Sequence, residues 1–244
     1  MDRIRMLGLN IDRVNMDEAL AVIDQFIARR QPSHVVTADS SMVVIAKEDP
    51  ELYAIIERAD LVTPDGAGVV WASRLLGQPI RDRVSGVDLV SRICERSVNG
   101  GSSVFFLGAA PGIADEAAAR LRAKYPGAQI VGTRHGYFSA AEEPAVVEEI
   151  RAAAPDVLFV AFGIPKQEKF IDRNKAAMGV PVCIGIGGSF DVHSGRVRRA
   201  PVWMQQAGFE WLFRLIQNPS KLSKVMKLPR FVLLALRVKL FGAL

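Results

Sequence analysis

Asp65 is the residue in this sequence best placed to act as a base. It lies between Pro64 and Gly66, immediately after a short apolar run. A carboxylate held by such a stiff turn has an open approach, and it can take the proton from an attacking hydroxyl. Aspartate also suits the N-cap of a helix that begins near residue 66. The chemistry of the side chain therefore leaves two roles open, general base and helix cap.

Other polar side chains follow other apolar runs. Arg81, Arg83 and Lys166 could neutralise a diphosphate leaving group, although lone surface cations commonly belong to a solvated face. Asp191 could accept hydrogen bonds from ribose hydroxyls or cap the next turn. Tyr137 could stack on a nucleobase or pack against the protein. The functional interpretations share one ligand, a nucleoside that carries a diphosphate.

Small and rigid residues recur in the same turns. Those that we expect to line a ligand site are Gly66, Gly108, Ala109, Gly163, Pro165, Gly187 and Gly188. Glycine tolerates positive φ, so turn geometry explains any one of these glycines. Several such turns together also fit close approach of backbone N–H groups to phosphate. A G-x-G-x-x-G fingerprint after the first strand is absent, which disfavours a nicotinamide dehydrogenase.

The acidic residues and histidines show no metal-binding pattern. His34, His135 and His193 lack the spacing of metal ligands, and no D-x-D pair is present. We therefore expect a reaction that needs neither a metal ion nor another cofactor.

Short apolar runs alternate with helical patterns between about residues 34 and 190, and these elements must position the polar residues. The runs cover residues 34–37, 61–63, 104–107, 129–131, 157–162 and 182–186. They are continuously apolar, which is typical of strands covered on both faces. The pattern predicts an α/β fold with a doubly wound, mostly parallel, Rossmann-like sheet. Ligands of such sheets bind beyond the carboxyl ends of the strands, where Asp65 and the glycine turns fall.

The pattern changes after Asp191, which predicts two parts. Residues 1–195 would form the α/β catalytic domain, and residues 196–244 a helical appendage that associates with a membrane. Within the appendage, residues 201–217 have the pattern of one aromatic-rich helix. The chain has no stretch of about 18 uncharged apolar residues, so we expect no membrane-spanning helix.

The tail concentrates positive charge. From Trp211 to Leu244 it holds seven basic residues and no acidic one, whereas the net charge of the whole chain is +5. The cations that we expect at a membrane are Arg214, Lys221, Lys224, Lys227 and Arg230. Each would attract anionic lipid by about 1 kcal/mol, while apolar neighbours enter the headgroup boundary. The tail could instead pack on its own chain or on a second copy, so a homo-oligomer is a further possibility.

Seven short motifs occur in the order and spacing of one known family. They are DGAGVV (residues 65–70), RVSGVDL (83–89), FLGAAPG (106–112), FGIPKQE (162–168), GGSFD (187–191), RAP (199–201) and EWLFRL (210–215). Each motif alone is weak, but the ordered set covers nearly the whole chain and is highly specific. The sequence resembles the WecG/TagA/CpsF glycosyltransferases.

This resemblance implies an inverting transferase with a UDP-sugar donor, often N-acetylmannosamine or a uronic acid. The acceptor would be a sugar on a polyprenyl (undecaprenyl) diphosphate carrier, and the product would enter cell-surface polysaccharides. Asp65 matches the proposed base of the family. Thr37, Arg83 and Gln167 match catalytic positions around the sugar and diphosphate, and Tyr137 and Asp191 match the nucleoside end.

Asp39 departs from the family, which often has asparagine at this position. A second carboxylate beside the site could alter the sugar preference or, by like-charge repulsion, the pKa of Asp65.

Two other classes of protein are alternatives. The chain could be another nucleotide-dependent Rossmann-like enzyme, such as an oxidoreductase, or a non-catalytic protein that binds membranes or nucleic acid through its basic tail. The glycine turns favour an enzyme, so we expect no nucleic-acid partner. Cys94 and Cys183 lie far apart in apolar surroundings and indicate reduced core residues. With the basic tail they predict a peripheral protein at the cytoplasmic face of the plasma membrane.

Overall fold

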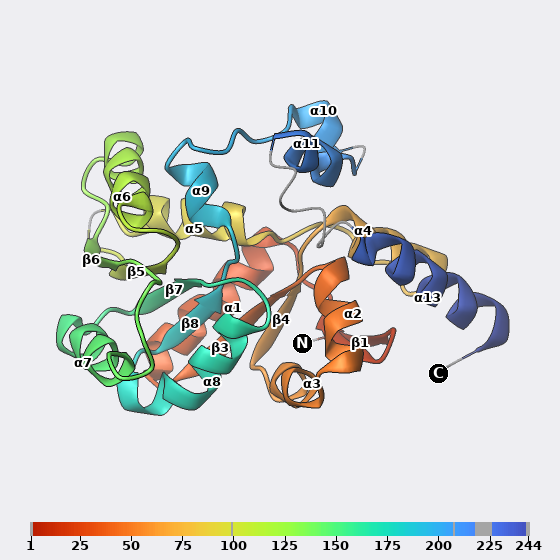
Figure 1. Ribbon diagram of the computed structural model, residues 1–244, viewed down its shortest axis with the longest axis horizontal. Coiled ribbons are helices and arrows are strands. Elements are labelled where there is room, and N and C mark those ends of the chain that lie inside the picture. The colour runs from red at the N-terminus through yellow and green to blue at the C-terminus, as the bar shows by residue number, and fades with distance from the viewer. Residues whose placement is uncertain (1, 99, 207, 218–225, 243–244) are drawn as a thin grey trace.

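A computed structural model describes residues 2–98, 100–206, 208–217 and 226–242 of the chain. Its centre is a parallel sheet of six strands in the order β4-β3-β8-β7-β5-β6 (Figure 1). The strands are β3 (Ser33–Ala38), β4 (Leu61–Pro64), β5 (Val104–Gly108), β6 (Ile130–Arg134), β7 (Val157–Ala161) and β8 (Val182–Gly185). Each overlaps one of the predicted runs, β6 only at residues 130–131. All but β6 are buried along their whole length, which explains the lack of alternation in those runs. The predicted α/β fold is confirmed.

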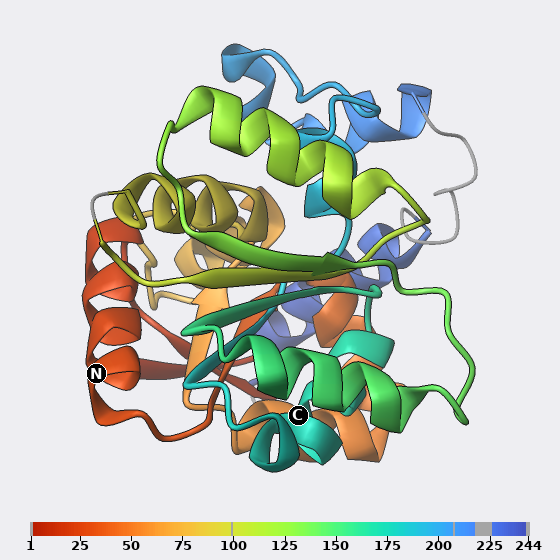
Figure 2. The same cartoon turned by 90° about the vertical axis from the view of Figure 1, so that its left-hand side faces the viewer.

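Helices cover both faces of the sheet, as Figure 2 shows for its β5–β6 edge. Successive strand residues point to opposite faces, so that Phe106 packs in one core cluster and its neighbours Phe105 and Leu107 in another. One face carries α1 (Met16–Arg29), α5 (Gly86–Arg96), α6 (Ile113–Lys124) and α9 (Ser189–His193). The other carries α2 (Ser40–Glu48), α3 (Pro50–Glu57), α7 (Glu143–Ala153) and α8 (Lys166–Met178).

An antiparallel hairpin at the N-terminus was not foreseen from the sequence. It consists of β1 (Arg3–Met6) and β2 (Leu9–Asp12), and its last residue ties it to the sheet. The buried Asp12 carboxylate accepts hydrogen bonds from Arg3 Nε at 2.8 Å and from the backbone N–H of Val62 at 2.7 Å. The capping box at the start of α1 was foreseen and is present, because Asn15 and Glu18 each accept from the backbone N–H of the other.

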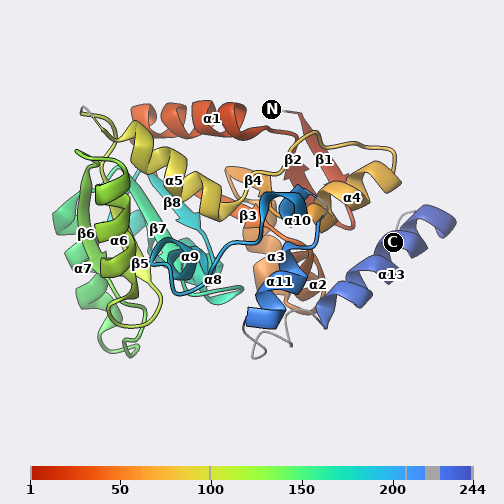
Figure 3. The same cartoon turned by 90° about the horizontal axis from the view of Figure 1, so that it is seen from above.

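The appendage is helical, but its first helix is divided. The prediction of one helix over residues 201–217 is wrong, because α10 (Val202–Gln206) and α11 (Glu210–Gln217) are separate helices. Gly208 lies between them with a φ of +80°, a conformation that does not continue a helix. The last helix, α13 (Lys227–Phe241), lies along α2 and α4 (Ala67–Leu75) (Figure 3). It buries Phe231 and Ala235 completely.

Both cysteines are free and buried, as predicted. Burial raises the pKa of the Cys94 and Cys183 thiols to about 12 in each case. Within the described ranges, no helix has the length and apolar character needed to cross a membrane.

Candidate active site

A cleft of about 1430 Å³ lies at the carboxyl ends of the six strands. Its walls come from the loops after all six strands and from parts of α11 and α13. The residues predicted from the sequence that line it are Thr37, Asp39, Asp65, Gly66, Arg83, Ala109, Tyr137, Gly163, Pro165, Lys166, Gln167, Gly187, Gly188 and Asp191. Gly108 is next to the lining residue Ala109. The parallel sheet therefore brings together residues that are up to 154 positions apart, such as Thr37 and Asp191.

Asp65 follows β4, and its carboxylate lies at the start of another helix. Its Oδ2 accepts a hydrogen bond of 3.2 Å from the backbone N–H of Gly86, the first residue of α5. The N-terminus of a helix favours negative charge, so this contact supports the ionised form that a base requires. The N-cap of α4 is Gly66, with a φ of +100°, so Asp65 does not occupy the capping position that the sequence had left open.

The two polar residues at the end of β3 are both engaged within the fold. The Thr37 hydroxyl donates to the carbonyl of Gly185 in β8 at 2.7 Å. Asp39 is the N-cap of α2, where its Oδ1 accepts from the backbone N–H of Met42 at 2.9 Å and from the Ser41 hydroxyl at 2.6 Å. These contacts fix both side chains at the wall of the cleft.

Gln167 joins two of the glycine turns. Its buried Oε1 accepts from the backbone N–H of Gly163 at 3.2 Å and from that of Gly187 at 2.9 Å, and its Nε2 donates to Glu168 at 2.7 Å. Both N–H groups are therefore used within the protein. Their glycines shape the turns, and any contact with phosphate must come from other donors.

Gly108 is required by close packing of the sheet. Its φ is +125°, and a Cβ atom there would lie 2.6 Å from the carbonyl oxygen of Ala161 in β7. A side chain at this position would push β5 and β7 apart. Ala109, the next residue, donates its backbone N–H to the same carbonyl at 2.9 Å.

The remaining predicted residues also line the cleft. Tyr137 is 72% exposed, so its ring is available to a ligand. Lys166 opens α8, immediately after its N-cap Pro165. Asp191 is in the first turn of α9. The roles of these three residues in nucleoside and diphosphate binding stay predictions.

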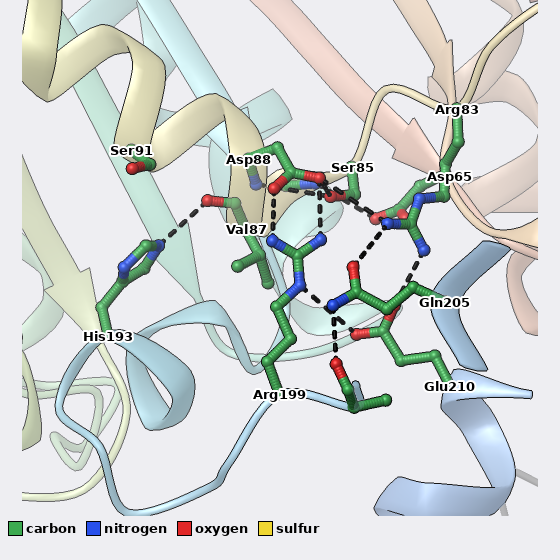
Figure 4. Close-up of polar contacts among 12 residues, drawn as sticks. Asp65, Arg83, Ser85, Val87, Asp88, Ser91, His193, Arg199, Gln205 and Glu210 are labelled. Carbon is green, nitrogen blue, oxygen red and sulfur yellow. Dashed lines mark hydrogen bonds and ion pairs between the residues drawn. The ribbon is translucent and has the colours of Figure 1, made fainter. Parts of the chain in front are cut away.

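A network of ion pairs at the cleft connects α5 and the segment before it with the appendage (Figure 4). Arg83 donates to Glu210 of α11 at 2.8 Å and to Gln205 of α10 at 3.4 Å. Asp88 of α5 accepts from both terminal nitrogens of Arg199. Partners 111 and 127 positions apart in sequence leave no local signal. The only sequence indication was that both ends of each pair fall within the family motifs.

The pKa values of Asp88 and Arg199 are both shifted in the direction that favours the charged side chain. Burial alone would raise the pKa of the Asp88 carboxyl, but hydrogen bonds from Arg199 and Ser85, together with the charges of Arg199 and Arg83, hold this pKa below its usual range. Burial alone would lower the pKa of Arg199, and the carboxylates of Asp88, Glu210 and Asp65 raise it above its usual value. The charged forms of Asp88 and Arg199 are thus both favoured beside Asp65.

The cations predicted to bind a membrane are only partly described. Lys221 and Lys224 lie outside the described residues, as does the side chain of Arg214. Lys227 lines the cleft, and Arg230 pairs with Glu48 of α2 at 3.2 Å. Among the described residues no group of three or more His, Cys, Asp or Glu side chains could hold a metal ion.

Comparison with known proteins shows which family this chain is similar to. The model of the glycosyl transferase WecG/TagA/CpsF family matches residues 4–243. A Bacillus spizizenii protein is 35% identical over 212 residues, which cover 87% of this chain and 82% of that protein. A Staphylococcus aureus protein is 29% identical over 232 residues, covering 94% and 91% of the two chains. Both relatives are N-acetylglucosaminyldiphosphoundecaprenol N-acetyl-beta-D-mannosaminyltransferases.

Proposed function

The chain belongs to the WecG/TagA/CpsF family of glycosyltransferases, and from that premise we propose that it moves a sugar from a UDP-sugar to a polyprenyl-diphosphate-linked acceptor in cell-surface polysaccharide synthesis. The observation that carries the proposal is the position of Asp65, in a cleft that also holds the predicted sugar, diphosphate and nucleoside residues. Among N-acetylmannosamine, uronic acid and hexose donors, the names of the relatives favour UDP-N-acetylmannosamine. They likewise favour an N-acetylglucosamine acceptor on undecaprenyl diphosphate.

The proposed reaction is a single in-line displacement. The acceptor hydroxyl loses its proton to Asp65, and its oxygen forms a bond with the anomeric carbon. The bond between that carbon and the diphosphate oxygen breaks on the opposite face, so UDP leaves with the electron pair and the anomeric configuration inverts. Arg83 and Lys166 are the cations that would stabilise the charge on the departing diphosphate. With these groups, the reaction would need no metal ion.

Replacement of Asp65 tests the role of the base. Asp65→Asn keeps the shape of the side chain but removes the proton acceptor, so we expect kcat for UDP release to fall by about 10²–10⁴-fold. The assay uses a panel of UDP-sugars with a short lipid-diphosphate N-acetylglucosamine acceptor. It contains EDTA throughout, so that activity also tests the absence of a metal requirement.

The control is Asp82→Asn, a matched change at an exposed residue in the segment before Arg83. It should keep the wild-type rate. Stabilisation of both variants by UDP in a thermal-shift experiment would establish that they fold and bind donor. Full activity of a folded Asp65→Asn protein would rule out the general-base role. Stabilisation of the wild type by NAD(P) instead of UDP would favour the alternative of an oxidoreductase.

We also propose that the enzyme works at the cytoplasmic face of the plasma membrane and that α13 contacts the lipid. Leu233, Leu236 and Leu240 are spaced three and four residues apart, so they share one face of α13, and all three are exposed. Phe231 and Ala235 are on the opposite, buried face. The exposed cations Arg230, Arg237 and Lys239 flank the leucines. A stripe of apolar residues between cations fits the headgroup boundary of an anionic membrane.

A further inference from the structure

Arg83, the residue predicted to meet the donor diphosphate, is already bound to a carboxylate. Its Nη1 lies 2.8 Å from Glu210 Oε2, and the two side chains are only 21% and 13% exposed. Both residues line the cleft. Figure 4 shows Glu210 of α11 reaching this guanidinium. A carboxylate is an anion with two oxygens that a guanidinium binds much as it binds phosphate.

The network holds more carboxylates than guanidinium groups. Asp65, Asp88 and Glu210 provide three negative charges, and Arg83 and Arg199 provide two positive charges. If every ion pair of this network stayed in place, an approaching donor diphosphate would meet a net negative charge. It would therefore have to take the place of one carboxylate at Arg83.

Glu210 is the carboxylate best placed to be exchanged. Asp88 is held by both terminal nitrogens of Arg199 and by the Ser85 hydroxyl at 2.6 Å, and it lies 3.8 Å from Arg83. Asp65 is fixed to the first residue of α5. Glu210 lies 3.8 Å from Arg199 Nε and belongs to α11, which Gly208 separates from α10 and which lies outside the sheet, so a shift of α11 would leave the sheet in place.

From these contacts we infer that Glu210 is a positioning residue that holds Arg83 at the cleft wall in the free enzyme and gives it up to the donor diphosphate. This inference rests on the proposed UDP-sugar donor. Glu210 keeps the guanidinium oriented before the donor arrives, and this contact lowers the affinity for the donor. Donor binding and the seating of α11 on Arg83 are then coupled, because both use the same cation.

The sign of the effect of Glu210→Gln on UDP affinity tests this inference. Loss of the competing charge should lower the Kd of UDP by about threefold to tenfold, the range expected for a largely buried ion pair. The Kd of uridine, which has no diphosphate, should stay unchanged. In turnover, the donor KM should fall while kcat stays nearly constant. The substitution removes the contact between Glu210 and Arg83, which is present in the free enzyme but not in the donor complex. Arg83 keeps Gln205 and Asp88 as neighbours in this variant, so its position is supported.

The movement of α11 has its own readout in Trp211, which follows Glu210 and lines the cleft. In a protein with Trp71→Phe and Trp203→Phe, Trp211 is the remaining tryptophan. UDP should change its emission, and addition of Glu210→Gln should produce the same change without UDP.

The matched control is Glu116→Gln, which breaks the exposed pair between Glu116 and Arg196 at the start of the appendage. It should leave the Kd of UDP unchanged. The inference is overturned if Glu210→Gln binds UDP as the wild type does or more weakly, or if Glu116→Gln tightens UDP to the same extent. If the wild type itself fails to bind UDP, the proposed donor is wrong, and this inference falls with it.

Discussion

The side chain of Gln167, which the sequence predicted to be catalytic, connects two turns of the cleft wall. Its Oε1 accepts from the N–H groups of Gly163 and Gly187, which belong to the turns after β7 and β8. Gln167→Leu would leave two partly buried N–H groups without this acceptor, at about 1–2 kcal/mol each, the lower part of the range for a lost partner. We therefore expect the variant to lose about 2–4 kcal/mol of unfolding free energy and to bind UDP more weakly, which urea unfolding and calorimetry would measure.

A purely catalytic role of Gln167 predicts a different result. The rate would fall while unfolding and UDP binding stayed as in the wild type, and that outcome would contradict the bracing role. Gln129→Leu is the matched control, because Gln129 is exposed and its side-chain amide donates to the nearby carbonyl of Gly127. Gln129→Leu should change neither the unfolding free energy nor the Kd of UDP.

Single residues could be assigned from the sequence only where local context carried the information. Asp65 could be found because proline and glycine flank it at a strand end. The helix cap made by Asp39 has a local basis too, since its partner Met42 is three positions away, but it was not foreseen. The pairs of Arg83 with Glu210 and of Arg199 with Asp88 join residues more than 100 positions apart, and no sequence pattern specifies which cation meets which acid.

At the scale of elements, the two faces of α13 differ in a way that bears on membrane binding. Leu233 and Leu240 are 66% and 72% exposed, although burial of a leucine side chain stabilises by roughly 1.5–3 kcal/mol. Replacing both by glutamine should therefore weaken binding to vesicles of phosphatidylglycerol and phosphatidylcholine by at least about tenfold. Co-sedimentation measures this affinity, and the Kd of UDP should be unaffected.

A control for the two substitutions is Val131→Gln, which changes an exposed apolar residue on the edge strand β6. It should bind vesicles as the wild type does. Vesicles of phosphatidylcholine alone should bind all proteins weakly, because the flanking cations then lack a partner. Equal co-sedimentation of the double variant and the wild type would show that α13 does not contact lipid through this face. Its apolar stripe would then fit the alternative of a second copy of the chain.

Elements were predictable where their patterns were long or fully buried. Five strands are buried at every residue, so their apolar runs stand out from the flanking helices. The hairpin of β1 and β2 has four-residue strands that mix Arg3, Arg5 and Asn10 with apolar residues, which gives too few positions to show a period. The division of residues 201–217 depends on the positive φ of Gly208. Glycine permits that conformation but does not require it.

For the whole molecule, the parallel direction of the strands explains why one cleft receives so many predicted residues. All carboxyl ends lie at one edge of the sheet, so six separate loops meet there. The closure of this edge by the appendage could not be inferred in the same way, because it depends on ion pairs between distant segments. The boundary near residue 195 stays a prediction, although Arg199, Gln205 and Glu210 all contact residues of the α/β part or line its cleft.

The stability of the whole fold should depend on a histidine in the sheet. The pKa of His34 is lowered to about 3, chiefly by burial and also by the neighbouring charges of Lys175 and Arg58, against the opposing effect of Asp172. In the unfolded chain the pKa is about 6.5, so below this pH the unfolded state binds a proton that the folded state does not. Stability from neutral His34 is thus complete above pH 6.5 and is lost as the pH falls toward 3. Between pH 7 and pH 5 the wild type should lose about 2 kcal/mol more unfolding free energy than His34→Leu. Urea unfolding of both proteins across this range measures the difference, and the effects of the other titratable groups cancel because both proteins contain them. If the two unfolding free energies changed with pH in parallel, His34 would take up its proton in the folded state.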